Sequence, residues 1–484
     1  MDEAILALVT PLVGALAILC LSSWPNLREA ATLLSVSSLL FILGLMLQNI
    51  LDGKTHDITL LQFAPGLSLA FKVEPFGMMF ALLAGSLWMI NSIYSIGYVR
   101  RNVLPRQTSF YLWFAVSLSA TMGIAFAGNL FTLFLFYEAL TLSTYPLVVH
   151  GKTNSDKAAG RVYLGLLLGT SISLFLIGIL WTWNIAGTLD FQLGGILKDK
   201  ISPGMIGMLL ALFTFGLGKV ALMPIHRWLP AAMVAPAPVS ALLHAVAVVK
   251  AGVFSLVKIL VYIFGIDFLS QSSSDNWLIY VAAFSMIAAG IIALYQDDLK
   301  RRLAYSTISQ LAYVVLAAAL AHPIALIGAM FQIIGHALGK IILFFAAGSI
   351  YTVSGFTKVS QLDGIGRRMP WTMAAFTIGA ICIVGLPGTI GFWGKWYMFQ
   401  GAAVSIQQLF IIGVLLTSTI VSAAYLMPII YVAFFKSELS PPPSHGEAPW
   451  PMVAAIMITA ATAIMLFFAV EWPYRLISLL KPLL

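Results

Sequence analysis

The sequence predicts an all-α polytopic membrane protein with about 14 transmembrane helices, forming a single transmembrane domain over residues 1–484. Three observations support this fold class. Of the 484 residues, 60% are hydrophobic and only 9% are charged, whereas soluble proteins carry about 25% charged residues. The mean hydropathy is +0.97, and the apolar runs approach the roughly 20 residues that cross a bilayer as a helix. This composition excludes a soluble enzyme, a disordered chain and a nucleic-acid-binding protein.

Polar breaks divide the chain into 14 predicted spans. The first is predicted to be a retained helix rather than a signal peptide, because acidic Asp2 and Glu3 precede a long apolar run. The gaps between spans, including 52–73 and 353–369, are predicted to be loops. The spans are 4–23, 29–51, 74–97, 108–127, 130–149, 160–186, 203–225, 237–264, 276–295, 302–321, 324–352, 370–402, 405–435 and 450–470.

The distribution of basic residues predicts the orientation of these spans. Of the 26 Lys and Arg residues, 15 lie in loops after odd-numbered spans, and six lie after even-numbered spans or in the C-terminal tail, which includes Lys481. Because basic residues concentrate in cytoplasmic loops, both termini are predicted to lie outside a cytoplasmic membrane. The net charge of +8 therefore reflects topology and not a nucleic-acid partner.

Five lysines lie well inside the predicted spans, and of the 18 acidic residues only Glu138 lies near the middle of a span. A charge at a helix centre costs about 2.5–3.5 kcal/mol, so these residues must face the bundle interior, where such groups mark ion paths or proton relays. A structural ion pair is the alternative for Glu138, and for Lys258, close to a helix end, snorkelling to the interface is expected. The six are Glu138, Lys219, Lys250, Lys258, Lys340 and Lys395.

Lys219 and Lys395 each lie beside predicted helix interruptions. Lys219 follows Gly216 and Gly218 and precedes Pro224, and Lys395 follows a run of glycines around Pro387. Interrupted helices in a membrane are tolerated only beside a cavity or other protein. If a carboxylate such as Glu138 lies beside a desolvated lysine, it holds the proton on the amine, and its withdrawal releases that proton.

Two further lysines extend this pattern of buried amines. Lys250 lies mid-span before Gly252, and His336 and Lys340 are four residues apart, so they share one helix face. We therefore predict that Glu138, Lys219, Lys250, His336, Lys340 and Lys395 form a proton relay.

The interrupted helices also suggest an internal repeat. They lie five spans apart, and paired interrupted helices are typical of transporters built from repeats. Units at 108–264 and 276–435 are predicted to be inverted relative to each other, because five crossings reverse the chain direction.

No cofactor or metal site is predicted. The sequence has no CxxC pair and no dinucleotide-binding pattern, and His226 and His244 have no partner at metal-ligand spacing. Gly388 to Lys395 has the wrong spacing for a phosphate-binding loop, and Trp396 replaces its Ser or Thr.

The sequence resembles the antiporter-like membrane subunits shared by complex I, membrane-bound hydrogenases and Mrp-type cation/proton antiporters. The resemblance covers about residues 73–400 and is closest to the D-type component of an Mrp antiporter. It implies a 14-helix fold with inverted repeats, a Glu138–Lys219 pair, a central Lys250 linking two half-channels, and Lys395 serving the second half-channel. The matching strings are Val73-Glu-Pro-Phe, Tyr94-Ser-Ile-Gly-Tyr98, Phe136-Tyr-Glu138, Met223-Pro-Ile-His-Arg-Trp-Leu-Pro230, Ala235-Pro-Ala-Pro-Val-Ser-Ala-Leu-Leu-His244, Lys300-Arg-Arg-Leu-Ala-Tyr-Ser-Thr-Ile-Ser-Gln310, His336-Ala-Leu-Gly-Lys340 and Gly385-Leu-Pro387 on to Lys395.

Three functions fit these residues. The first is a proton-translocating subunit of a multisubunit Na⁺/proton antiporter, a transporter rather than an enzyme, with sodium passing through a partner membrane subunit. The second is a cofactor-free subunit of a complex I-type NADH:quinone oxidoreductase or a membrane-bound hydrogenase. The third is a scaffold whose buried charges are only structural pairs. The protein's expected surroundings are the lipid bilayer and other membrane subunits.

Overall fold

The computed structural model describes residues 2–54, 57–272, 276–437 and 445–480. Lys481, which the charge distribution places on the outer side, lies outside these ranges. Eleven of the described helices are long and apolar enough to cross a membrane. The other three predicted spans correspond to α14 (Leu299–Ala319), to the short helix α8 (Pro203–Gly216) and to the pair α16 (Pro370–Val384) and α17 (Gly391–Ala403). The predicted all-α polytopic fold is confirmed.

The remaining helices follow the predicted order closely. The helices of the N-terminal half are α1 (Glu3–Cys20), α2 (Pro25–Leu51), α3 (Pro75–Arg101), α4 (Gln107–Ala125), α5 (Leu130–Val148), α6 (Asn154–Thr170), α7 (Leu176–Ala186), α9 (Trp228–Ala231), α10 (Ala237–Ala241), α11 (Val248–Ile259) and α12 (Ile266–Ser270). Those of the C-terminal half are α13 (Asn276–Tyr295), α15 (Pro323–Ser354), α18 (Gln408–Phe435), α19 (Trp450–Phe468) and α20 (Glu471–Ser478).

Short helical turns of the 3₁₀ or π type join several of these helices. π-Helical turns continue α6 into α7, α10 into α11, and α11 towards α12, so two long spans run over Asn154–Ala186 and Ala237–Phe264. These π turns are η1 (Ser171–Phe175), η4 (Leu242–Val246) and η5 (Leu260–Phe264), and the 3₁₀ turns are η2 (Gly218–Val220), η3 (Ala232–Val234), η6 (Val359–Gln361) and η7 (Ile365–Arg367). π turns occur mostly at functional sites.

Both predicted helix interruptions are present. Helix α8 ends at Gly216, and the chain then forms η2 and reaches Ala221, whose φ is +58°. Helix α16 ends at Val384, and Gly385 takes a φ of +82° before α17 begins. A side chain on Gly385 would also collide with Lys395, since its Cβ would lie 2.6 Å from Lys395 Cδ. Each interruption therefore frees backbone groups beside a buried lysine.

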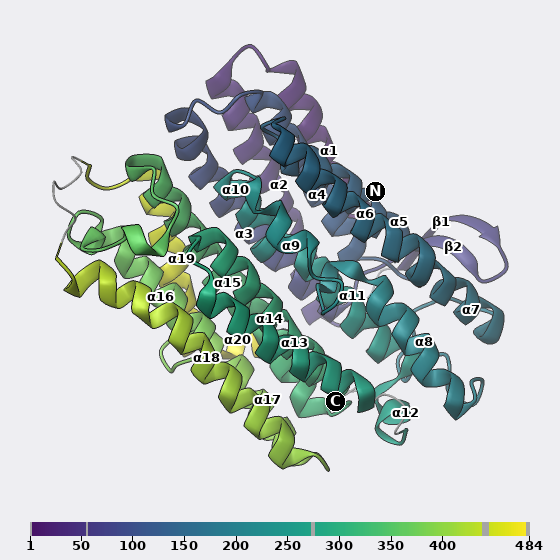
Figure 1. Cartoon of the computed structure of the whole chain (residues 1–484). Helices are drawn as coiled ribbons and strands as arrows, with labels where there is room; N and C mark the ends of the chain where they lie inside the picture. Colours follow the sequence, from purple (N-terminus) through teal and green to yellow (C-terminus); the bar gives the residue numbers. More distant parts are fainter. Residues whose placement is uncertain (1, 55–56, 273–275, 438–444, 481–484) are drawn as a thin grey trace.

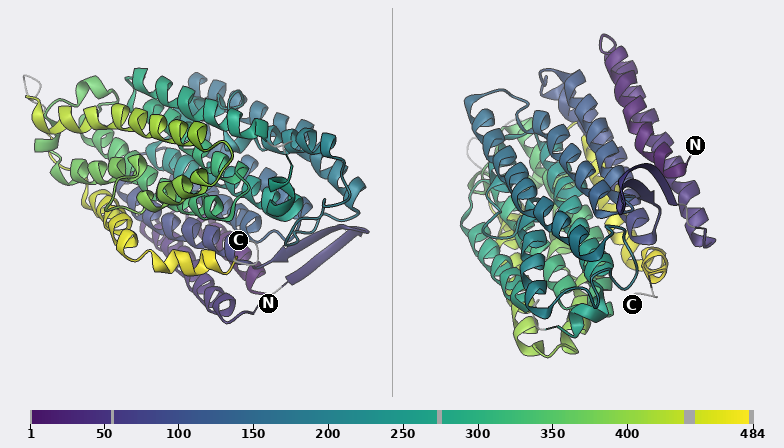
Figure 2. Two further views of the ribbon diagram at one scale, coloured as in Figure 1. Left: turned by 90° about the horizontal axis from the view of Figure 1, so that it is seen from below. Right: turned by 90° about the vertical axis from the view of Figure 1, so that its right-hand side faces the viewer.

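The prediction of a loop over 52–73 is wrong. Residues Asp57–Ala64 (β1) and Leu67–Lys72 (β2) form an antiparallel hairpin that projects from the end of the helical bundle (Figures 1 and 2). Ala70 and Phe71 at the base of β2 bond to the chain around Gly128, between α4 and α5. The hairpin thus begins and ends close to helix ends on the predicted outer side.

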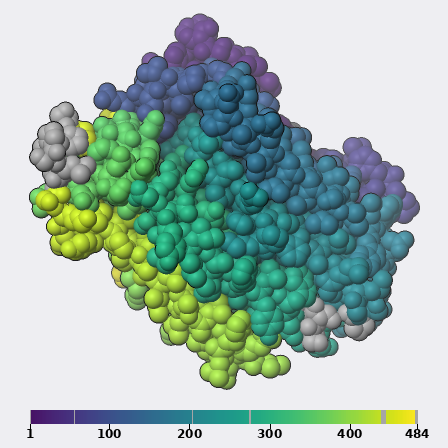
Figure 3. Space-filling view, in the orientation of Figure 1, coloured from purple at the N-terminus to yellow at the C-terminus, as the bar shows by residue number. Residues whose placement is uncertain are grey.

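The helices lie side by side, with α15 near the middle of the bundle (Figure 1). The 32 residues of α15 contain a fully buried window, and this helix packs against α14, α16, α17 and α19. Its glycines permit close contact with α17, because a Cβ on Gly335 would lie 2.8 Å from the Cα of Gly391. Small residues allow membrane helices to approach in this way. On the face shown in Figure 3, the purple, teal and green parts of the chain form neighbouring bands.

Candidate functional site

Lys219 lies fully buried at the interruption after α8, with its side chain against α5. Its Nζ donates hydrogen bonds to the carbonyl of Tyr137, at 2.7 Å, and to Thr141 Oγ1, at 2.6 Å. The same Nζ lies 3.2 Å from the centre of the Tyr137 ring, and the Lys219 amide donates to the Tyr137 hydroxyl at 3.0 Å. The lysine is therefore held by neutral groups of one helix turn.

Glu138 is on the same turn of α5, but its carboxylate does not bond to Lys219 in this structure. Both carboxylate oxygens are buried and have no hydrogen-bond partner among the residues that the structure describes. The pair implied by the resemblance is therefore not formed here, although the charge of Glu138 still acts on Lys219. An unpaired buried carboxylate is costly. Glu138 is consequently a group that gains by moving to a partner or to water.

Lys250, on α11, meets His336 of α15 in the centre of the bundle. Its Nζ contacts His336 Nδ1, and Nε2 of the same ring has no partner. Lys219 and Lys250 come from neighbouring segments, because η2 packs directly on α11 at Gly252, where a Cβ would lie 2.5 Å from the Lys219 carbonyl carbon. The structure therefore brings the first interruption close to the central lysine.

Lys340 lies one helical turn after His336 and reaches α14. Its Nζ donates to the Leu303 carbonyl at 3.0 Å and to Ser306 Oγ at 2.6 Å. The Ser306 hydroxyl in turn lies 2.7 Å from the hydroxyl of Tyr425 on α18. Lys340 is thus the start of a hydrogen-bonded row between α14, α15 and α18.

This row continues through four polar side chains. The hydroxyl of Tyr425 donates to Ser422 Oγ at 3.3 Å, and Gln310 Nε2 also donates to Ser422 Oγ, at 3.2 Å. Gln332 Nε2 then donates to Gln310 Oε1 at 2.8 Å. All four side chains lie within the bundle, so the row carries hydrogen-bonding groups from Lys340 along α14.

Lys395, on α17 at the second interruption, lies beside Tyr313, which is one turn further along α14 than Gln310. Its Nζ donates to the carbonyl of Val384, at 2.7 Å, and to Thr419 Oγ1, at 3.1 Å, and it lies 4.7 Å from the centre of the Tyr313 ring. The Tyr313 hydroxyl lies 3.3 Å from Thr419 Oγ1. Lys395, Thr419 and Tyr313 therefore form a second polar group, separated from the row that begins at Lys340 by the turn of α14 between Gln310 and Tyr313.

Sequence reasoning missed the polar side chains between the lysines. A signal was present in the predicted span 302–321, because Ser306, Gln310 and Tyr313 are spaced i, i+4 and i+7 and so share one helix face.

The predicted relay also omitted His244, which lies on η4. His244 is fully buried, and neither of its ring nitrogens has a partner. The charges of Lys250, Lys300 and Lys340 act on its ring, which places it among them.

The expectation that Lys258 snorkels to the interface is wrong. Lys258 is 0% exposed, and its Nζ lies 2.7 Å from Glu74 Oε1. It also donates to the Ala127 carbonyl at 2.7 Å and lies 4.5 Å from the centre of the Phe191 ring. This buried ion pair joins α11 to the start of α3 and the end of α4, and within the described ranges none of the relay lysines has such a carboxylate at ion-pair distance.

The site has donors and hydroxyls but few anionic ligands. A lysine ammonium is donor-only, whereas hydroxyl and imidazole groups both donate and accept. In the described ranges no three His, Cys, Asp or Glu side chains gather at metal-binding distance. The arrangement is suited to passing protons between amines through hydroxyl and imidazole groups.

Residues 127–422 match the family described as "NADH:quinone oxidoreductase/Mrp antiporter, TM". The chain belongs to this family. The match contains both helix interruptions and every residue of the predicted relay. Within this NADH:quinone oxidoreductase/Mrp antiporter family, the chain is 34% identical over 363 residues to NADH-quinone oxidoreductase subunit N of Desulforudis audaxviator, over 74% of this chain and 71% of that protein. This chain covers 61% of the length of one further relative and 64% of the length of another.

Two solved structures of multisubunit complexes contain chains with the same fold. One is a chain of the membrane-bound sulfane sulfur reductase, an archaeal respiratory membrane complex, with a TM-score of 0.86, 26% identity, and coverage of 99% of this chain and 96% of that chain. The other is a chain of the Mrp complex from Dietzia sp. DQ12-45-1b, with a TM-score of 0.82, 20% identity, and coverage of 98% and 96%. The second likeness is evidence for the fold alone.

Proposed function

We propose that this chain is a proton-translocating subunit of a multisubunit membrane complex. One observation carries the proposal: four buried lysines, two of them at the helix interruptions, are each hydrogen-bonded to neutral groups. An ammonium bound to a carbonyl, hydroxyl or imidazole can release its proton without leaving a carboxylate unpaired. Ionisable groups in this position are the hallmark of proton relays in membranes.

The relay works by moving one charge at a time. Protonation of one lysine disfavours protonation of the next, because like charges repel strongly where water is excluded. Glu138 starts this sequence when it approaches Lys219 and holds a proton there. When Glu138 withdraws, the proton passes towards Lys250 and His336, then to Lys340 and, along the hydroxyl row, to Lys395.

The two interrupted helices support a repeat of the transport unit. We propose that residues 108–264 and 276–435 are inverted repeats, each with one interruption and one lysine beside it. Transporters built in this way place their coupling sites at the interrupted helices. One repeat would then exchange protons with one side of the membrane, and the second repeat with the other side.

For the driving reaction we propose exchange of Na⁺ for protons in an Mrp-type antiporter, with this chain in the place of its D-type component. The oxygens around the relay lysines already accept from ammonium groups, and Glu138 is the one carboxylate of the relay, so we propose that sodium passes through a partner membrane subunit. The fold likeness to a chain of the Mrp complex is consistent with this assembly.

A redox-driven complex is the second candidate. It is favoured by the 34% identity to an NADH-quinone oxidoreductase subunit and by the higher TM-score to a chain of a respiratory complex. Under this alternative the chain is a cofactor-free subunit of a complex I-type oxidoreductase or a membrane-bound hydrogenase. Copurification of the complex followed by mass spectrometry separates the two, since iron–sulfur subunits accompany only the redox assembly.

Proton transport by the purified complex in liposomes tests the relay itself. We expect Glu138→Gln and Lys395→Met each to lower the rate of proton transport about 100-fold, the range that a positioned acid or base contributes. Glu471→Gln, at an exposed residue at the start of α20, is the control. Assembly without proton transport would exclude a scaffold function, and transport that survives both relay variants would refute the proposal. Sodium flux by the isolated chain that persists in Glu138→Gln would refute the assignment of sodium to a partner.

A further inference from the structure

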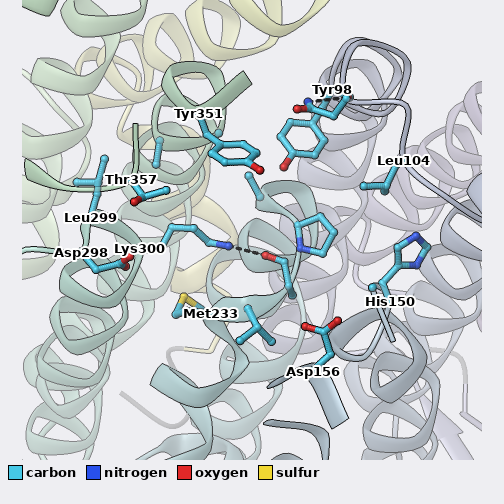
Figure 4. Close-up of a pocket in the computed structure, with 18 of the residues that line it drawn as sticks. Tyr98, Leu104, His150, Asp156, Met233, Asp298, Leu299, Lys300, Tyr351 and Thr357 are labelled. Carbon is cyan, nitrogen blue, oxygen red and sulfur yellow. Dashed lines mark hydrogen bonds between the residues drawn. The ribbon is translucent and has the colours of Figure 1, made fainter. Parts of the chain in front are cut away.

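A cavity of about 410 Å³ opens at one end of the bundle, between its two halves (Figure 4). It is lined by the end of α3, the turn between α5 and α6, the start of α10, the turn before α14, and the end of α15. Every one of these segments follows an odd-numbered span, so the cavity lies on the predicted cytoplasmic side. Polar groups that line it include Tyr98, His150, Asp156, Lys300 and Tyr351.

Lys300 extends its amine across this cavity. The Nζ donates a hydrogen bond to the carbonyl of Ala235, which precedes the first turn of α10 (Figure 4). Lys300 therefore joins the start of α14 to the start of the long span over Ala237–Phe264. His244 lies on this same span, seven residues after Ala237, or about 10 Å along a helix.

The other ionisable groups of the cavity already have structural partners. Asp156 Oδ2 accepts from the Thr153 amide at 2.9 Å, and Asp298 Oδ1 accepts from the Arg301 amide at 2.8 Å, so both carboxylates cap helices. His150 Nε2 bonds to the Pro105 carbonyl at 2.7 Å, and burial, opposed by this bond, lowers the pKa of His150. The two acids are thus not gathered into a cation site.

On the span that Lys300 contacts through Ala235, the imidazole of His244 has no hydrogen-bond partner for either nitrogen among the described residues. A fully buried imidazole with two unpartnered nitrogens needs water or another polar group as a partner. Without one, the free-energy cost of removing its nitrogens from water is not offset by any hydrogen bond. The charges of Lys300, which lines the cavity, and of Lys250 and Lys340, which belong to the proposed relay, all act on this ring. His244 is therefore close enough to both groups of lysines to feel their charges.

We infer that the cavity is a water-filled cytoplasmic inlet and that Lys300 passes protons between its water and His244. The inference rests on the proposed proton-translocating function. In each step the neutral amine of Lys300 takes one proton from an acid in the cavity water. It then gives that proton to a ring nitrogen of His244 and returns to the neutral amine.

Substitutions at Lys300 in the complete complex test this role. Lys300→Arg keeps a positive donor for the Ala235 carbonyl but cannot release a proton. We expect Lys300→Arg and Lys300→Gln each to lower proton transport in membrane vesicles about 100-fold, with normal assembly. Arg301→Gln, at the exposed neighbouring residue, should leave the rate within twofold. Transport near the original rate in Lys300→Arg would show that the lysine is only a structural donor and would overturn the inference.

A second measurement keeps Lys300 intact. Met233→Cys, in a Cys20→Ser background, places a thiol on the cavity wall, and a water-soluble quaternary-ammonium thiosulfonate reagent is added to one side of the membrane at a time. We expect labelling from the cytoplasmic side only, with proton transport reduced at least tenfold once labelling is complete. Leu343→Cys, deeper in α15 and outside the cavity, should stay unlabelled. No labelling, labelling from the outer side only, or undiminished transport after complete labelling would overturn the inference.

The two proposals fail in different ways. If Glu138→Gln and Lys395→Met keep proton transport, the relay itself is wrong. If these variants stop transport while Lys300→Arg and fully labelled Met233→Cys keep it, the relay stands and only the inlet is wrong.

Discussion

Two lysines on α11 have the same burial but opposite surroundings. Lys250 and Lys258 are both 0% exposed and lie eight residues apart, or about 12 Å along the helix. Lys250 meets the imidazole of His336, whereas Lys258 is held by the carboxylate of Glu74 and the carbonyl of Ala127. Burial alone therefore does not distinguish Lys250, which we propose as a transport residue, from a structural lysine. The charge of the partner does, because a carboxylate keeps the proton on the amine.

The largest expected effect is the loss of transport in Lys250→Met. Removing a proton-accepting amine from the centre of the relay should lower the rate of proton transport between about 100- and 10,000-fold per assembled complex. Stability should not fall, because no carboxylate is left unpaired by this change. Fluorescence quenching measures transport, and the thermal midpoint of the detergent-solubilised complex measures stability. Lys358→Met, in an exposed loop, is the control. Full transport in Lys250→Met would place Lys250 with Lys258 as a structural lysine.

Lys258→Met should have the opposite effect to Lys250→Met, lowering stability and leaving proton transport per assembled complex unchanged. It leaves Glu74 buried without its partner, which costs about 3–5 kcal/mol, so we expect a lower thermal midpoint and less assembled complex. The double variant Lys258→Met/Glu74→Leu replaces both charges by apolar groups and should recover most of this stability. Transport per assembled complex should remain. An unchanged thermal midpoint in the single variant would contradict the structural assignment.

Gly252→Ala tests the contact between α11 and the first interruption. The added Cβ would lie 2.5 Å from backbone atoms of Lys219 and Val220, and overpacking of this kind costs about 1–3 kcal/mol. We expect lower stability together with slower proton transport, because η2 must shift and carries Lys219 with it. Gly165→Ala on α6 meets no atom within 4 Å and should be neutral or stabilising. Equal behaviour of the two variants would show that η2 does not depend on this contact.

The smallest effect is expected for Tyr425→Phe. The change removes the hydroxyl between Ser306 and Ser422 but keeps the ring. One net hydrogen bond is worth about 1 kcal/mol, so proton transport through the row should slow about fivefold. Tyr431→Phe, on the exposed face of the same helix, should not change the rate. If Tyr425→Phe slows transport no more than this control, protons bypass the Tyr425 hydroxyl.

The sequence predicted the spans and both helix interruptions, because apolar composition, glycine and proline act locally. The hairpin over Asp57–Lys72 was missed, since its strands are short and pair with each other and with the chain near Gly128. The partner of Lys258 was missed for a different reason. Glu74 lies 184 positions away in the chain, and only the packing of α3 against α11 brings the two together. The hydroxyl row was readable on one face of α14, but its links to α18 were not.

The π turn η4 sets the angular phase of α11. The Ala247 amide bonds to the Leu242 carbonyl, five residues back, so this turn holds one residue more than an α-helical turn. Each residue of an α-helix adds about 100° of rotation. Deletion of one residue from Leu242–Val246 would restore a regular α-helix. It would also rotate α11 by about 100° relative to Pro236. Lys250 would then face away from α15. The additional residue in η4 therefore sets the rotation of α11 at which Lys250 points toward His336.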